Sequence, residues 1–215
     1  LDSNGEMAVD QLIEDGDNYY YVDVNGVMAA NQWVAIDNED AGDDDEPEHY
    51  WYYFQANGKA LKQGDSDTVS LKTVNGKKYA FDEYGAMVAE WSLDEDDEKK
   101  ASDTEAQEAA STASTSEAWE GNGKYAKYTQ AWKYYNSVED GSRVSKGWFK
   151  VVSAEYLNED KYNDDEDSWY YADGSGNLYA GEFKTIKGKK YAFDNYGRMI
   201  SGLVFLEMAN GTTSN

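Results

Sequence analysis

The residues best suited to binding chemistry in this sequence are tryptophans and tyrosines that alternate along predicted strands. Trp51 and Tyr53 are two residues apart, and Trp169 and Tyr171 repeat that spacing. Side chains two positions apart in a strand point to the same face, so each pair presents neighbouring rings. Exposed aromatic rings attract cations and are typical of recognition surfaces. Both pairs are therefore candidate ligand-binding residues.

Carboxylates are the second group of residues that could do chemistry. The segment from Asp37 to Glu48 has a spacing similar to that of a calcium-binding loop, although Ala41 occupies a position where such a loop needs a ligand. The candidate metal ligands are Asp37, Glu39, Asp43, Asp45 and Glu48. Solvated acidic loops are one alternative, and carboxylates that help to attract a positively charged ligand are another. No cofactor is expected unless this loop binds calcium.

Charge and composition narrow the class of partner. The chain has 43 acidic against 19 basic residues, a formal net charge of −24. This charge repels nucleic acid and anionic membranes within a Debye length of about 8–10 Å. No apolar run is long enough to span a membrane, and the chain opens at Leu1 without a signal peptide. We therefore expect no nucleic-acid partner and no membrane insertion. We also expect that the chain is a fragment or a processed product of a longer protein.

Catalysis is not expected. The chain has no cysteine, and its single histidine, His49, lies in an acidic segment. Carboxylates are so abundant that no pair of them is distinguished as acid and base. We predict that the chain is not an enzyme.

An internal repeat positions the aromatic residues. Residues 73–87 recur as residues 185–199, with eleven of fifteen positions identical, and looser copies begin at Tyr19, Trp51 and Trp169. Each copy has an aromatic strand with two-residue alternation and a following turn that contains glycine, as at Asn25-Gly26 and Asn57-Gly58. A second turn, at Asn75-Gly76 or Lys187-Gly188, precedes the strand. Isolated hairpins are marginal, so neighbours must stack. The sequence predicts an all-β chain, a β-solenoid of tandem β-hairpin repeats with a helical insertion.

The alternation also assigns two faces to each hairpin. Apolar residues recur at equivalent positions, which we assign to the core: Tyr20, Val22, Tyr52, Phe54, Tyr79, Phe81, Tyr191 and Phe193. On the opposite face, Trp51 and Trp169 alternate with Lys78 and Lys190. A face that changes between Trp and Lys from one repeat to another is not needed for core packing, so binding is expected there.

These motifs resemble the cell-wall-binding repeat family, which includes choline-binding, glucan-binding and clostridial-toxin-type repeats. The resemblance rests on Gly147-Trp148, on the aromatic runs at 51–54 and 169–171, and on Gly-Lys-Lys-Tyr-Ala-Phe-Asp with its following Tyr-Gly-Xaa-Met. It implies an extracellular protein of the cell wall or cell surface, whose partner is a wall polymer, choline or a glycan. In choline-binding members, two Trp of one unit and an aromatic residue of the next form a box for a quaternary ammonium.

The resemblance implies three candidate Trp pairs in this chain. They are Trp33 with Trp51, Trp91 with Trp132, and Trp148 with Trp169. The two Trp positions are 18, 41 and 21 residues apart, whereas the corresponding gap is 7 residues in the units without paired Trp. The additional residues fall at hairpin tips and hold over half of all carboxylates.

The longest insertion divides the chain. We expect N-terminal repeats at 1–91, an acidic Ala/Ser/Thr-rich insertion or linker at 92–131, and C-terminal repeats at 132–215. The part at 92–118 is predicted to be either a disordered linker or a solvated helix around Glu105 to Ala110. Two functions fit the whole chain: a non-catalytic module that binds wall or glycan through Trp sites, or a structural spacer or adhesin scaffold with acidic, calcium-binding tips.

Overall fold

The computed structural model of the chain describes residues 4–39, 41, 46–64, 70–93 and 124–202. These residues form two compact units. The first unit comprises the described residues of Leu1–Glu90 together with Tyr135–Ser142, and the second those of Trp91–Tyr134 and Arg143–Asn215. No helix in the described segments is long and apolar enough to cross a membrane.

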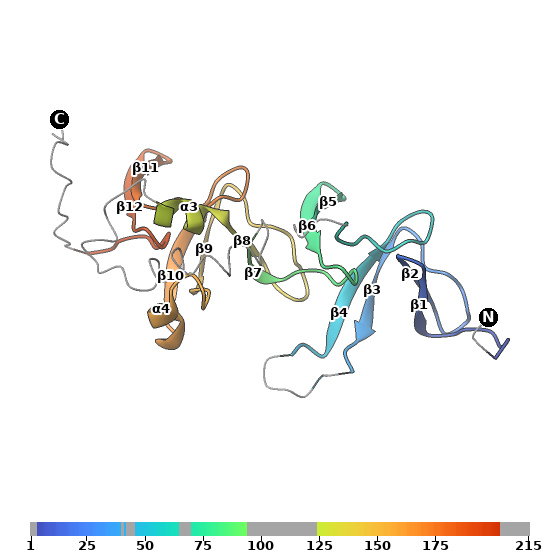
Figure 1. The fold of residues 1–215 in the computed structure, drawn as a ribbon. Helices are drawn as coiled ribbons and strands as arrows, with labels where there is room; N and C mark the ends of the chain where they lie inside the picture. The colour runs from blue at the N-terminus through green and yellow to red at the C-terminus, as the bar shows by residue number, and fades with distance from the viewer. Residues whose placement is uncertain (1–3, 40, 42–45, 65–69, 94–123, 203–215) are drawn as a thin grey trace. The chain divides into compact units, whose positions relative to one another are not determined.

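Two-stranded hairpins make up most of the described secondary structure (Figure 1). Antiparallel pairs form between β1 (Gln11–Asp15) and β2 (Asn18–Val22), β3 (Gln32–Asp37) and β4 (His49–Phe54), β5 (Ser70–Val74) and β6 (Lys77–Phe81), β9 (Gly147–Val152) and β10 (Asp167–Ala172), and β11 (Glu182–Ile186) and β12 (Lys189–Phe193). A further sheet pairs β7 (Glu90–Leu93) with β8 (Trp132–Tyr135). The prediction of an all-β chain of hairpins is confirmed.

The tight hairpin tips have the turn chemistry that their sequences predict. Asn75 and Gly76 have φ values of 49° and 81°, and Lys187 and Gly188 have values of 48° and 79°. Two consecutive residues with positive φ are characteristic of the type I′ turn, whose twist matches that of the flanking strands. Glycine and asparagine adopt this conformation readily, so the turn fixes the register of the strands on either side.

An aspartate organises the turn that follows most hairpins. The Oδ1 atom of Asp82 accepts hydrogen bonds from the backbone N–H groups of Tyr84 and Ala86, at 2.9 and 2.8 Å. Asp194 accepts equivalent bonds from Tyr196 and Arg198. These bonds hold the chain in a sharp turn. The turn brings the next residues back to the hairpin, where Phe81 bridges to Met87 and Phe193 to Met199.

Successive hairpins within a unit are joined through the residue at this bridge. In the first unit, the N–H of Ala60 donates to the carbonyl of Tyr19, and the N–H of Met87 donates to the carbonyl of Trp51, both at 2.8 Å. In the second unit, the N–H of Met199 donates to the carbonyl of Trp169 at 2.8 Å. Each bond connects one repeat to the returning strand of the repeat before it.

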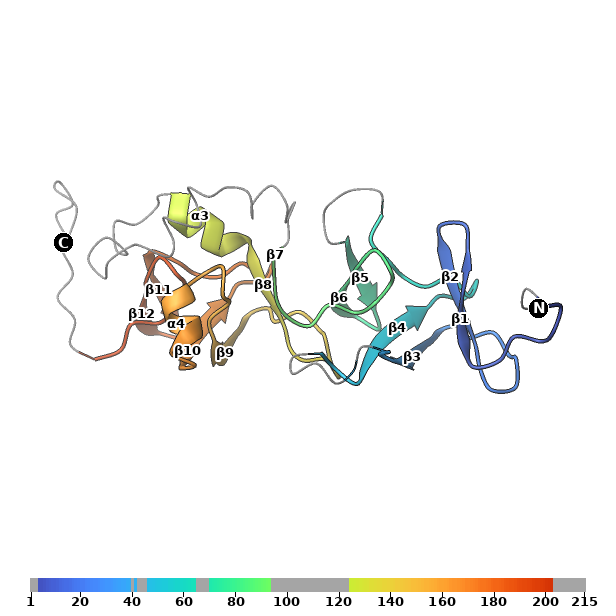
Figure 2. The same cartoon turned by 60° about the horizontal axis from the view of Figure 1, so that its bottom comes forward.

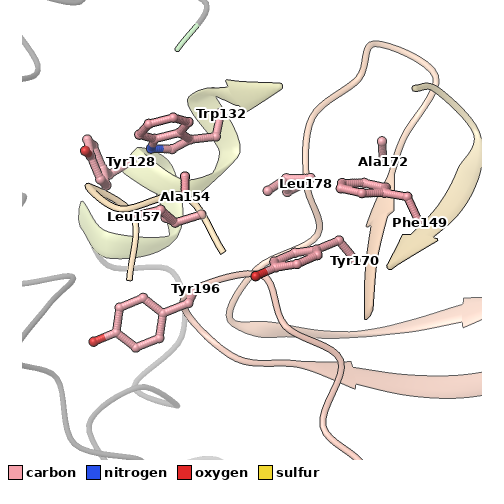
Figure 3. Packing of buried hydrophobic residues seen from close by; sticks show 9 residues of the cluster. All are labelled: Tyr128, Trp132, Phe149, Ala154, Leu157, Tyr170, Ala172, Leu178 and Tyr196. Carbon is pink, nitrogen blue, oxygen red and sulfur yellow. The ribbon is translucent and has the colours of Figure 1, made fainter. Parts of the chain in front are cut away.

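The cores are built mainly from aromatic rings. In the first unit, the buried residues include Tyr52, Phe54, Tyr79 and Phe81, as the alternation predicts. In the second unit the core consists of Tyr128, Trp132, Phe149, Ala154, Leu157, Tyr170, Ala172, Leu178 and Tyr196 (Figure 3). Three residues assigned to the core from sequence, Tyr20, Val22 and Tyr191, are only half-buried.

The described helices lie in inserted segments (Figures 1 and 2). Helix α3 (Lys124–Ala131) leads directly into β8. The short helix α4 (Glu159–Asn163) lies between β9 and β10, and Oδ1 of Asn158 caps it by accepting a bond from the Lys161 N–H at 3.3 Å. The prediction for 92–118 lies outside the described residues.

Candidate functional site

Trp33 and Trp51 lie on the same face of the β3–β4 hairpin. The register pairs Trp33 with Tyr53 and Ala35 with Trp51, so the two indoles are diagonal neighbours across the strands. The ring centroids of Trp33 and Tyr53 are 5.2 Å apart at 66°, an edge-to-face contact. The hairpin register thus places three of the predicted ligand-binding rings together.

The next hairpin completes the arrangement. The Tyr79 ring on β6 lies 4.9 Å from Trp33 at 61°, and Phe81 lies 5.8 Å from it at 27°. Met87 follows on the bridging segment and is fixed to Trp51 by the backbone bond described above. Trp33, Trp51, Tyr79 and Met87 line a pocket of about 310 Å³, which we call the N-terminal box.

Two carboxylates complete the lining of this box. Glu139 and Asp140 belong to the turn after β8. The Trp51 Nε1–H donates to Glu139 Oε2 at 3.0 Å, and His49 Nε2 lies 2.8 Å from Glu139 Oε1. Lys77 Nζ lies 3.5 Å from Asp140 Oδ2. The box therefore combines aromatic rings with two acidic groups, a combination suited to a cation.

The acidic turn is held in shape by its own hydrogen bonds. The Ser137 hydroxyl accepts bonds from the N–H groups of Glu139 and Asp140, at 3.3 and 3.1 Å. Partial burial opposes ionisation of Asp140, but hydrogen bonds from Ser142 and the charge of Lys77 outweigh it and lower the pKa of this carboxyl. Asp140 is therefore ionised at neutral pH.

The C-terminal box, formed by Trp148, Trp169 and Tyr191, repeats this ring geometry in the second unit. Trp148 lies 5.1 Å from Tyr171, 4.8 Å from Tyr191 at 64°, and 5.8 Å from Phe193 at 25°. The Trp148 and Trp169 rings are 6.3 Å apart at 87°, and Trp169 is 43% exposed. Tyr171 also stacks on Tyr179 at 5.3 Å.

The middle pair, Trp91 on β7 and Trp132 on β8, has a different environment. The two rings are 6.3 Å apart at 86°. Trp132 is only 6% exposed and belongs to the core of the second unit, against which Trp91 packs. The Trp91 Nε1–H donates to the carbonyl of Val152 at 2.8 Å. This pair is enclosed by the protein's own side chains.

The predicted calcium ligands are only partly described. Asp37 ends β3, and Glu39 and Glu48 belong to the same tip, where the Asn38 N–H donates to the carbonyl of Glu48 at 2.9 Å. Asp43 and Asp45 lie outside the described residues. Among the residues that are described, no group of three or more His, Asp or Glu side chains could hold a metal ion.

Sequence reasoning missed part of both boxes. Alternation assigned Tyr79 and Tyr191 to the core alone, yet Tyr79 lines the N-terminal box and Tyr191 contacts Trp148. The available signal was the third aromatic residue, supplied by the next unit, that the family resemblance implies. Glu139 and Asp140 gave no comparable signal, because the turn that carries them is distant in sequence from Trp33 and Trp51.

Comparison with known proteins gives one sequence relative and several similar folds. No family model matches the chain. It is 26% identical over 206 residues to glucosyltransferase-S of Streptococcus mutans serotype c. The aligned region covers 87% of this chain and 13% of that protein. The predicted resemblance to the cell-wall-binding repeat family is confirmed.

The similar structures have low sequence identity. Choline binding protein F from Streptococcus pneumoniae is 19% identical, with a TM-score of 0.45, covering 89% of this chain and 59% of that one. The modular autolysin LytC from the same organism is 16% identical, with a TM-score of 0.40, covering 92% and 35%. This chain thus spans a minority of the length of both the glucosyltransferase and the autolysin.

Proposed function

We propose that the chain is a non-catalytic binding module that attaches its parent protein to the bacterial cell wall, or to a related glycan, through its two aromatic boxes. One observation supports this most directly. The distances from the leading Trp to the Tyr and Phe of the next hairpin are 4.9 and 5.8 Å in one box and 4.8 and 5.8 Å in the other. The interplanar angles agree within a few degrees.

Packing alone does not account for this repetition. A ring that only fills a core has no need to leave its face accessible, yet Trp169 is 43% exposed and Trp51 lines an open pocket of about 310 Å³. Exposed aromatic clusters in a soluble protein are typical of recognition sites. Recurrence of one open arrangement in separate units therefore supports a common ligand group.

The charges favour a cationic ligand at the N-terminal box. Glu139 and Asp140 line it beside Trp51, with Lys77 facing Asp140 and His49 facing Glu139. The two carboxylate oxygens of Glu139 already contact Trp51 and His49. The negative charge of Glu139 can therefore attract a cationic ligand that has no hydrogen-bond donor. A quaternary ammonium such as choline, which has no N–H to donate, suits this arrangement better than a neutral saccharide does.

We also propose that the hairpins form a β-solenoid and that the protein acts outside the cell. The backbone bonds from Ala60 to Tyr19, from Met87 to Trp51 and from Met199 to Trp169 support stacking of successive repeats within each unit. The extracellular location follows from the proposed ligand, because wall polymers lie on the outer side of the membrane. Choline is the first probe to test because one similar structure is named for binding it.

The test is isothermal titration with choline chloride and, in parallel, with dextran as a neutral glucan. Two or three ring contacts of roughly 0.5–2 kcal/mol each predict a dissociation constant in about the millimolar range. The double variant Trp51→Ala with Trp169→Ala should abolish binding. The matched control replaces Tyr84 and Tyr162, which are 58% and 45% exposed and lie outside both boxes, by Ala. Equal binding by the double Trp variant and the wild type would refute the proposal.

A further inference from the structure

The middle pair has the ring geometry of an open box. Trp91 and Trp132 are 6.3 Å apart at 86°, as Trp148 and Trp169 are at 6.3 Å and 87°. Trp91 lies 5.1 Å from Tyr134 on its partner strand, as Trp148 lies 5.1 Å from Tyr171. The Trp91 ring also lies 5.0 Å from the ring of Tyr170 in the next hairpin, and Tyr170 is the residue equivalent to Tyr191 in the C-terminal box. The framework of a third box is therefore present.

Side chains from two inserted segments cover this framework. Tyr128 of α3 lies 6.3 Å from the Trp132 ring at 86°. Leu157, from the segment between β9 and β10, is fully buried in the same core cluster as Trp132 and Tyr170. Figure 3 shows Leu157 and Ala154 lying by Tyr128, next to the Trp132 side chain. The rings that the other boxes expose are here in contact with the chain itself.

The two covering segments are also bonded to each other and to the core. The Tyr128 hydroxyl donates to the carbonyl of Tyr156, next to Leu157, at 3.2 Å. The Thr129 hydroxyl donates to the carbonyl of Asn195. A turn closed by bonds from the N–H groups of Leu157 and Asn158 to the Ala154 carbonyl, at 3.1 and 3.0 Å, fixes the leucine in position. The cover is thus ordered rather than incidental.

One buried atom distinguishes Trp132 from a residue that serves packing alone. The indole Nε1 of Trp132 is buried and has no hydrogen-bond partner in the described structure. A buried unpaired donor is costly, and a position used only for packing would be served equally well by Phe, which has no such donor. An indole at this position matches Trp51 and Trp169, which occupy the equivalent repeat positions in the two proposed boxes.

We infer that Trp91, Trp132 and Tyr170 form a third ligand box that is occupied by the chain's own insertions, with Leu157 in the place of the ligand. The branched end of a leucine side chain carries two methyl groups on one carbon and is close in shape to a trimethylammonium group. It lacks the charge, so it fills the space between the rings without cation–π attraction. The inference rests on the proposed function and specifies which sites remain available for binding.

Leu157→Ala tests this inference, and Leu178→Ala is its matched control. Leu178 is 1% exposed in the same core, and Figure 3 shows it beside Phe149 and above Tyr170. Acrylamide quenching of tryptophan fluorescence is measured first, because it needs no ligand. We expect more accessible tryptophan fluorescence in Leu157→Ala than in Leu178→Ala. Titration with choline chloride should then show one further bound choline per chain in Leu157→Ala only.

The outcomes separate the inference from the proposed function. Equal quenching in both variants, or unchanged choline stoichiometry in a Leu157→Ala protein whose wild type binds choline, would overturn the inference. If even the wild type binds no choline, the proposed ligand is wrong, and the quenching result alone decides whether Leu157 covers the box. Trp132→Phe serves if Leu157→Ala does not fold. It should leave the choline stoichiometry of the wild type unchanged, and loss of a bound choline would contradict the inference.

Discussion

Trp51 and Glu139 are 88 positions apart in the chain, yet the indole N–H of Trp51 donates to a carboxylate oxygen of Glu139 at 3.0 Å. This bond fixes the orientation of a ring that forms one wall of the N-terminal box. It also places a negative charge at the edge of that box. One residue therefore contributes both the position of the ring and part of the electrostatic attraction, and these contributions can be separated by substitution.

Glu139→Gln should weaken choline binding with little effect on stability. The amide oxygen of Gln can still accept the Trp51 hydrogen bond, so the ring stays in place while the charge is lost. A unit charge near a cation at the surface contributes about 1 kcal/mol, so we expect a three- to tenfold rise in the dissociation constant. Titration calorimetry and thermal melts measure the two effects. Glu83→Gln, which removes an exposed charge outside the box, is the control, and equal affinities of the two variants would refute a role for Glu139.

Tyr79→Leu should weaken choline binding by roughly 2- to 30-fold, because one ring contact contributes about 0.5–2 kcal/mol. Leucine keeps an apolar side chain at this 8% exposed position but presents no ring face to the ligand. Tyr79→Phe keeps the ring and should bind as the wild type does. Calorimetric titration of both variants is the measurement. If Leu and Phe give the same affinity, Tyr79 serves only the core, as its place in the alternation predicts.

Gly141→Ala should displace the acidic turn. A Cβ atom at Gly141 would lie 2.7 Å from the backbone oxygen of Val88, which is too close for an ordinary contact. The turn must shift, so Glu139 and Asp140 move relative to the rings. We expect a loss of about 1–3 kcal/mol in the free energy of unfolding, from denaturant melts, together with weaker choline binding. Gly64→Ala, where a Cβ atom would meet nothing within 4 Å, should change neither property.

Asp140→Asn should make the protein less sensitive to acid. The pKa of Asp140 is lowered from its ordinary value of 3.8 in the folded chain. A carboxyl with a lowered pKa stabilises the fold above its unfolded-state pKa, and this stabilisation is lost as the pH falls through the folded-state pKa. The free energies of unfolding of the two proteins should therefore converge below about pH 3.8. Urea melts across this range provide the test, and a constant difference between the proteins would contradict the prediction.

Local sequence signals predicted the hairpins because the relevant physics is local. Two-residue alternation and the turns at Asn75-Gly76 and Lys187-Gly188 determine the strands and their register within a few residues. The alternation did not separate core from binding site. In a stack of two-stranded hairpins, the face that packs on the preceding repeat also meets its binding rings, so Tyr79 is both buried and part of the N-terminal box.

The remaining site residues depend on contacts that no local pattern encodes. Glu139 reaches Trp51 from the far side of the longest insertion. The environment of Trp132 depends on Tyr128 and Leu157, which belong to segments without a repeat counterpart. The pairing of Trp91 with Trp132 follows from the repeat. The burial of these two rings by Tyr128 and Leu157 depends instead on how the inserted segments fold.

The backbone bond from Met87 to Trp51 has a mechanical consequence. The N-terminal box takes its rings from two successive hairpins, and this bond joins the same two hairpins. A ligand held between the rings would therefore link the two hairpins, and binding to the folded state alone resists unfolding by mass action. If the chain is the proposed wall anchor, a pulling force on it would act on this junction between hairpins. Under that proposal, ligand binding and resistance of the hairpin junction to extension would rise together.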